Sequence, residues 1–177
     1  MVEPLRQRET KVVTLIALCG AIVWLGGYNI RALLSLYLIQ FGTLEFKPMI
    51  HPYVERTVFA LISQSGMIDG IGYIVVWIAG IVFLVRTPLK LKQEGWLMMS
   101  AVLFYVFTPV EVYTMVLDVQ MWLLDHAGSN DLVEFRKLFI HRLGALSGVP
   151  LIALMCYYTA IGVMIFKPLR KKDAAAE

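Results

Sequence analysis

Four long apolar segments dominate the sequence, and each is long enough to cross a lipid bilayer. They cover residues 12–41, 57–85, 95–124 and 138–166. About 20 apolar residues in a helix span the ~30 Å hydrocarbon core, so segments of this length must tilt or protrude. Isolated strands would leave backbone groups unpaired in lipid, whereas helices satisfy their own. The sequence therefore predicts an all-α polytopic membrane protein, a single membrane domain over residues 1–177 folded as an antiparallel up-down bundle of four transmembrane helices.

The composition agrees with this prediction. Of the 177 residues 59% are apolar and 16% are charged, against roughly 45–50% and 25% in soluble domains. These values exclude a soluble globular domain, a disordered chain and a disulfide-stapled secreted domain. The net charge of +3 is too small to indicate a nucleic-acid partner. Cys19 and Cys156 both fall inside apolar segments and form no disulfide or metal-binding pattern.

The distribution of Lys and Arg predicts the orientation, because cytoplasmic loops carry an excess of these residues. The N-terminal segment, the 86–94 loop and the C-terminal tail hold ten of them. The other side holds five, namely Lys47, Arg56, Arg136, Lys137 and Arg142. We therefore expect both termini in the cytoplasm and a bacterial inner (cytoplasmic) membrane as the location. On the outer side, Asn130 or Asp131 could N-cap an early start of the fourth helix.

Several ionisable side chains lie within the apolar segments, where each costs several kcal/mol unless it is paired or hydrated. They are Arg31, Asp69, Glu111, Asp118, His141 and Arg142. A rise of about 1.5 Å per residue places all of them between mid-membrane and the outer boundary. Two interpretations stay open. Arg31, Asp69, Glu111, Asp118 and Arg142, with Tyr28, could form a buried polar layer that is the functional site; or the four shallower groups, Arg31, Asp118, His141 and Arg142, could snorkel to the interface.

Glycine and proline patterns suggest how the helices meet near this layer. Gly66 and Gly70 have small-xxx-small spacing, as do Gly144 and Gly148, and such patterns let helix backbones approach closely. Packing of these two pairs would bring Asp69 near Arg142 or Ser147. Pro109 and Pro150 remove backbone hydrogen bonds, and we expect each to kink its helix and free carbonyls that can line a cavity.

Three histidines, His51, His126 and His141, fall on the outer side in this topology. A metal such as copper, with Met49 or Met121 nearby, is one interpretation of them, and interfacial histidines without a function are the other. A bis-histidine haem needs two histidines inside the spans, and only His141 approaches that position. Haem, quinone and copper therefore stay open as cofactors.

Three short motifs carry a resemblance: Trp24-Leu-Gly-Gly27 followed by Arg31 within the first segment, Glu55-Arg56 at the start of the second, and Lys167-Pro168 at the end of the fourth. In these residues and in the helix layout of most of the chain, the sequence resembles the HemJ-type protoporphyrinogen oxidases and the CopD-type copper-resistance membrane domains. HemJ-type proteins carry a histidine early in the first helix that is thought to bind haem, and residues 17–24 here contain none. The resemblance thus implies a four-helix membrane fold, and no catalytic residue is carried over from it.

These observations leave three classes of function. The first is a non-catalytic or accessory subunit of a larger membrane complex of the respiratory or oxidoreductase type, with other membrane proteins or further copies of the chain as partners. The second is a small membrane oxidoreductase or cofactor carrier of HemJ-like or CopD-like type. The third is a transporter, which without an internal repeat would need dimerisation to form a pathway. No nucleophile triad, phosphate loop or metal-ligand set indicates hydrolytic chemistry.

Overall fold

A computed structural model describes residues 2–40, 42–87, 94–144 and 148–168 of the chain. Within these residues the chain forms six α-helices and no strand. The helices are α1 (Val2–Leu38), α2 (Pro52–Arg86), α3 (Gly95–Tyr105), α4 (Thr108–His126), α5 (Leu132–Leu143) and α6 (Val149–Phe166). Four stretches are long and apolar enough to cross a membrane: residues 8–38 of α1, all of α2, α3 with α4, and α6. The predicted all-α polytopic membrane fold is confirmed.

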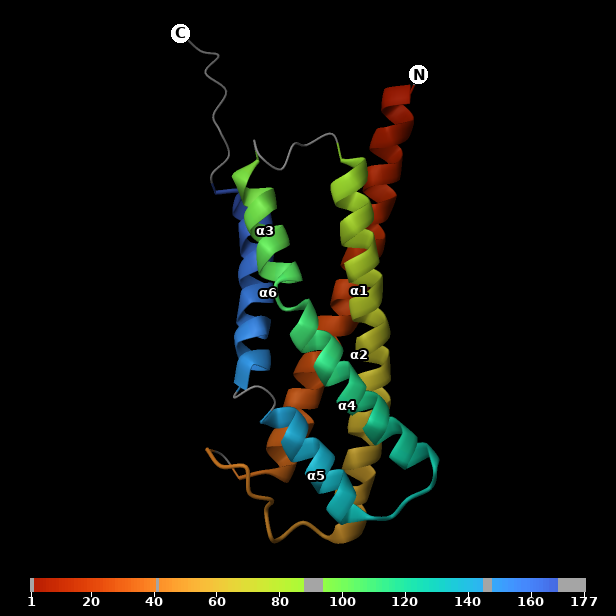
Figure 1. The fold of residues 1–177 in the computed structure, drawn as a ribbon, viewed down its shortest axis with the longest axis vertical. Helices are drawn as coiled ribbons and strands as arrows, with labels where there is room; N and C mark the ends of the chain where they lie inside the picture. The colour runs from red at the N-terminus through yellow and green to blue at the C-terminus, as the bar shows by residue number, and fades with distance from the viewer. Residues whose placement is uncertain (1, 41, 88–93, 145–147, 169–177) are drawn as a thin grey trace.

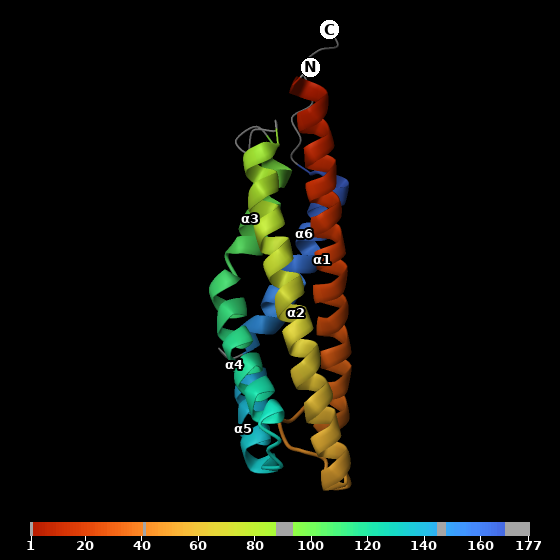
Figure 2. The same ribbon diagram turned by 90° about the vertical axis from the view of Figure 1, so that its right-hand side faces the viewer.

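The helices are arranged along one long axis (Figure 1). α1 and α2 run antiparallel and lie side by side in both views, and α3 lies beside α6 (Figures 1 and 2). The start of α1 and the end of α6 lie at the same end of the molecule, which we call the proximal end; α4 and α5 extend toward the opposite, distal end. Gly20 and Gly72 allow the close contact of α1 with α2, because a Cβ atom on either glycine would lie 3.2 Å from the other's carbonyl oxygen.

The third apolar segment differs from the expected single helix. α3 ends at Tyr105 and α4 begins at Thr108, with Phe107 as its N-cap at φ −91° and ψ 4°. Pro109 lies in the first turn of α4, where a missing N–H costs no hydrogen bond. The proline therefore begins a new helix, and the expectation that it kinks a continuous one is wrong.

The fourth apolar segment is likewise divided, so a continuous helix over 138–166 is wrong. α5 ends at Leu143, and α6 begins at Val149 after Gly148, whose φ of 86° requires the left-handed region that glycine tolerates. Pro150 lies in the first turn of α6, as Pro109 does in α4. The expected early helix start is confirmed, because Asp131 Oδ1 accepts hydrogen bonds from the backbone N–H groups of residues 133 and 134, at 3.0 and 3.3 Å.

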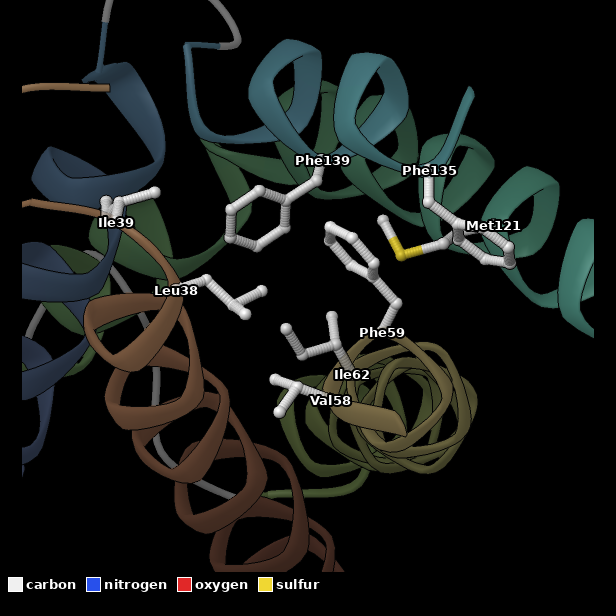
Figure 3. Close-up of a cluster of buried hydrophobic side chains, with 8 residues drawn as sticks. All are labelled: Leu38, Ile39, Val58, Phe59, Ile62, Met121, Phe135 and Phe139. Carbon is white, nitrogen blue, oxygen red and sulfur yellow. The ribbon is translucent and has the colours of Figure 1, made fainter. Parts of the chain in front are cut away.

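The described residues form three buried apolar clusters: a small one of Trp96, Leu97 and Val163 between α3 and α6, and two larger ones at different heights along the axis. The distal cluster joins α1, α2, α4 and α5 and includes Leu38, Ile39, Val58, Phe59, Ile62, Met121, Phe135 and Phe139 (Figure 3). The aromatic cluster joins α1, α2 and α6 and includes Trp24, Leu25, Tyr73, Ala153, Leu154 and Tyr157. Along α1, Arg31 comes midway between Trp24 of one cluster and Leu38 of the other. A polar layer thus separates the two larger apolar clusters.

Candidate buried polar site

The centre of the polar layer is an ion pair between α1 and α4. Arg31 Nη1 donates to Asp118 Oδ2 at 2.9 Å, and Arg31 Nη2 donates to Asp118 Oδ1. Both residues are 4% exposed. Two-point pairing of a guanidinium with a carboxylate fixes both side chains and satisfies most of their hydrogen-bonding groups. This interaction stabilises two charges far from water, and neither side chain snorkels.

Two further charged side chains extend this pair to α2 and α5. Arg142 Nε donates to Asp118 Oδ1 at 2.5 Å, and Arg31 Nη1 donates to Asp69 Oδ2 at 3.4 Å. Asp118 therefore accepts from two arginines, whereas Asp69 has one long contact. Among the described residues, Asp69 Oδ1 and Arg31 Nε are buried atoms without a hydrogen-bond partner. We call Arg31, Asp69, Asp118 and Arg142 the charged network.

Glycines make room for the charged network. A Cβ atom at Gly66 would lie 3.2 Å from both Arg31 Cζ and Asp118 Cβ, and one at Gly27 would overlap Asp69 Oδ1. The predicted packing of Gly66 and Gly70 against Gly144 and Gly148 is not what the structure has. Gly70 faces the Met115 side chain; a Cβ at Gly144 would meet only Ile140 O, and one at Gly148 meets nothing within 4 Å in the described part of the chain. Asp69 accordingly pairs with Arg31 rather than with Arg142, and Ser147 lies outside the described residues.

Glu111 lies beside the charged network but has a different partner. Its Oε1 accepts a hydrogen bond from Tyr157 OH of α6 at 3.0 Å, and the residue is 6% exposed. No arginine or lysine of the described residues lies within ion-pair distance of it. Tyr157 was not identified from the sequence, because a tyrosine in an apolar segment is most often a packing residue.

Tyr28 completes the set of predicted residues. Its hydroxyl donates to the carbonyl oxygen of Pro150 at 3.4 Å, which joins α1 to the first turn of α6. A small cavity is lined by Tyr28, Glu111 and the charged network, together with Trp24, Gly70, Tyr73, Thr114 and Met115. The centre of a water-sized sphere can occupy about 10 Å³ of it, which is room for roughly one water molecule.

A second group of ion pairs, not predicted from the sequence, lies at the distal end. Arg136 Nε and Nη2 donate to the two carboxylate oxygens of Glu55 at 2.6 and 2.7 Å. Arg56 pairs with Asp125 at 2.7 Å and lies 4.4 Å from the centre of the Phe135 ring. The hydrogen bonds that Arg136 donates to Glu55 raise the pKa of the Arg136 guanidinium above its ordinary value. The Glu55–Arg136 pair thus joins α2 to α5, and the Arg56–Asp125 pair joins α2 to α4.

The three histidines have separate local contacts. His51 N-caps α2 and its Nδ1 accepts from the Tyr53 N–H at 3.3 Å, His126 stacks on Trp122 at 4.8 Å, and His141 Nε2 lies 2.7 Å from Tyr113 OH. Within the described residues no three His, Cys, Asp or Glu side chains gather in a group that could hold a metal ion. The three histidines thus have separate surroundings, and copper, haem and quinone stay open as cofactors.

Comparison of the chain with protein-family models, with curated proteins and with solved structures gave no match. The resemblance to HemJ-type and CopD-type proteins stays a prediction.

Proposed function

We propose that this integral membrane protein is a non-catalytic subunit of a larger membrane assembly, and that its charged network holds α1, α2, α4 and α5 in the arrangement that partners recognise. The observation that supports the proposal is that Asp118 of α4 accepts hydrogen bonds both from Arg31 of α1 and from Arg142 of α5. Charged side chains that pair with one another across several helices hold those helices together.

The size of the cavity supports the same proposal. Ligand pockets are commonly about 300–1,000 Å³, whereas the space between the charged network, Glu111 and Tyr28 accommodates about one water molecule. A haem or a quinone ring needs far more room than this. The oxidoreductase or cofactor-carrier alternative therefore has less support from the geometry than the accessory role.

The outward faces of the helices supply the surface for the assembly. On α1, Leu15, Ile22, Ile30 and Leu33 are 60%, 64%, 57% and 68% exposed. Apolar side chains in such numbers are covered by lipid, and in a complex some are covered by neighbouring helices. The partners are accordingly other membrane proteins or further copies of this chain.

The test is the native mass of the protein extracted from its own membrane in mild detergent. The expected result is a complex of fixed stoichiometry well above the 20.0 kDa of the chain, measured by light scattering after size exclusion and by native mass spectrometry. Asp118→Asn should reduce the fraction in the complex, whereas Asn130→Ala, at an exposed position, should not. A monodisperse single chain would contradict the proposal. A visible spectrum before and after dithionite completes the test, since a Soret band that shifts on reduction would favour the haem alternative.

A further inference from the structure

The ionisable groups that line the cavity do not balance in charge. Arg31 and Arg142 are positive, and Asp69, Glu111 and Asp118 are carboxylates. If all five were ionised, the site would carry one net negative charge within the membrane-spanning part of the protein. An uncompensated charge in such a place is costly, and proteins avoid it by pairing or by neutralising the group. The site therefore needs one further positive charge.

The geometry indicates which carboxylates can hold that charge. Asp118 accepts from both arginines, so it is the group whose negative charge is most fully compensated. Among the described residues, the Glu111 carboxyl group has the Tyr157 hydroxyl as its one hydrogen-bond partner, and the Asp69 carboxyl group has a single 3.4 Å contact with Arg31. The side chain of Asp69 is 6% exposed, and its Oδ1 has no hydrogen-bond partner among the described residues. Glu111 and Asp69 are thus the two incompletely satisfied acids, and both line the same cavity.

We propose that the site binds one proton, held on Glu111 and exchangeable with Asp69 through a water molecule in the cavity. In the transfer, the Glu111 carboxyl gives its proton to the water, and the water gives a proton to the Asp69 carboxylate. One O–H bond breaks at Glu111 and one forms at Asp69, so the number of protons and the net charge are unchanged. This inference does not depend on whether the chain has partner proteins.

Every element packed around the cavity contributes a group that bears on this proton. α1 supplies Arg31 and Tyr28, α2 supplies Asp69 and Tyr73, and α4 supplies Glu111 and Asp118. α5 supplies Arg142, and α6 supplies Tyr157, which donates to Glu111. A metal cation is a weaker candidate than a proton for the missing charge, because the Arg31 guanidinium lies beside Asp69 and would repel it.

Infrared spectra of the purified protein at neutral pH, recorded in H₂O and in D₂O, test the proposal. A protonated carboxyl group has a C=O stretch that is separate from the carboxylate bands. The wild type should show one such band, with the small downshift in D₂O that marks an exchangeable O–H. Glu111→Gln should lose the band, because the four remaining charges then balance. Glu134→Gln is the matched control at an exposed position, and its band should be unchanged.

The Asp69→Asn variant distinguishes a proton shared by Glu111 and Asp69 from a proton that belongs to Glu111 alone. With Asp69 neutralised, the two arginines balance Asp118 and Glu111, so Glu111 should ionise and the band should disappear. If Asp69→Asn keeps the band of the wild type, the proton belongs to Glu111 alone and the shared site is overturned. Absence of the band from the wild type overturns it as well.

Two further measurements keep the proposal falsifiable if Glu111→Gln does not fold. Tyr157→Phe removes the hydrogen bond to Glu111 and should shift the band without abolishing it; an unshifted band would assign the proton to another residue and overturn the proposal. Replacement of choline chloride by sodium chloride should leave the band unchanged. Loss of the band in sodium would show that a metal cation occupies the site and would equally overturn it.

Discussion

Arg31 and Asp118, 87 residues apart in the sequence, form a two-point ion pair in which each guanidinium Nη atom donates to a different carboxylate oxygen. Both side chains are at least nine-tenths buried. Removal of Arg31 would leave Asp118 with Arg142 alone and would leave Asp69 without its ion-pair partner, and a buried charge that loses its partner is costly.

Arg31→Met should therefore lower the free energy of unfolding by about 3 kcal/mol or more. The measurement is reversible unfolding in mixed micelles, or the thermal midpoint in mild detergent. The control is Arg86→Met, since Arg86 pairs with Glu9 with both side chains 56% exposed, and such surface pairs contribute about 0–1 kcal/mol. Equal effects of the two substitutions would show that the charged network does not stabilise the fold.

Gly27→Ala should destabilise the protein, because the added Cβ atom would overlap Asp69 Oδ1. A side chain forced into a packed interior typically costs about 1–3 kcal/mol. Gly26→Ala is the matched control, since nothing lies within 4 Å of a Cβ atom there, and alanine is the better helix former by about 1 kcal/mol. In the same unfolding assay, Gly27→Ala should therefore lower the stability and Gly26→Ala should raise it, although the two glycines are adjacent. If Gly27→Ala left the free energy of unfolding unchanged, α1 and α2 would have to lie further apart than the structure shows.

The Glu55–Arg136 pair should show a large coupling energy in a double-mutant cycle of Glu55→Gln and Arg136→Gln. Glu55 has a side chain only 3% exposed and accepts two hydrogen bonds from Arg136, so loss of Arg136 leaves a buried carboxylate. A coupling of about 1.5–3 kcal/mol is expected for hydrogen bonds to charged groups. Lys137→Gln, at the exposed neighbouring position, should change the stability by less than about 0.5 kcal/mol.

The pH dependence of this coupling follows from the raised pKa of Arg136. A group whose pKa is higher in the folded state stabilises the fold fully below its unfolded pKa and ceases to do so only as the pH rises through the folded value. Both values for arginine lie far above neutrality. The contribution of Arg136 should therefore be constant throughout the neutral range, and a decrease in the coupling there would contradict the assignment.

The orientation of the protein is testable with single cysteines. After Cys19→Ala and Cys156→Ala, we expect Asn130→Cys to react with a membrane-impermeant maleimide in intact cells and Pro168→Cys to react only after lysis. The reason is that Lys and Arg are concentrated at the end that holds the termini. The opposite labelling pattern would place the distal end in the cytoplasm.

Much of the fold was predictable because few backbone conformations satisfy their own hydrogen bonds in lipid. Long apolar segments must be helical, and charged groups within them must find partners, so Arg31, Asp69, Asp118 and Arg142 could be selected from the sequence before their contacts were known. The pairing was not predictable in the same way. Which carboxylate meets which arginine depends on the rotation of each helix about its axis, and that rotation is set by side-chain packing between elements distant in the sequence.

The two helix breaks show a different kind of limit. Pro109 and Pro150 were visible in the sequence, but a proline is compatible both with a kink within a helix and with the first turn of a new one. Gly148, with its left-handed backbone, decides the matter for α6. The distal ion pair of Glu55 with Arg136 was missed because each residue looked like an ordinary charge near a membrane boundary.

The division of the charged network among α1, α2, α4 and α5 has a consequence for how the protein is made. Arg31 enters the membrane first, with no counter-charge until Asp69 follows on the next segment; the two together are neutral and can insert as a hairpin. Asp118 then arrives and pairs with Arg31, so Asp69 and Asp118 share one guanidinium until Arg142 follows on the fourth segment. The third segment therefore reaches its stable position only after the fourth segment has been synthesised, which couples translation to insertion. A chain truncated before Arg142 should be degraded by membrane proteases.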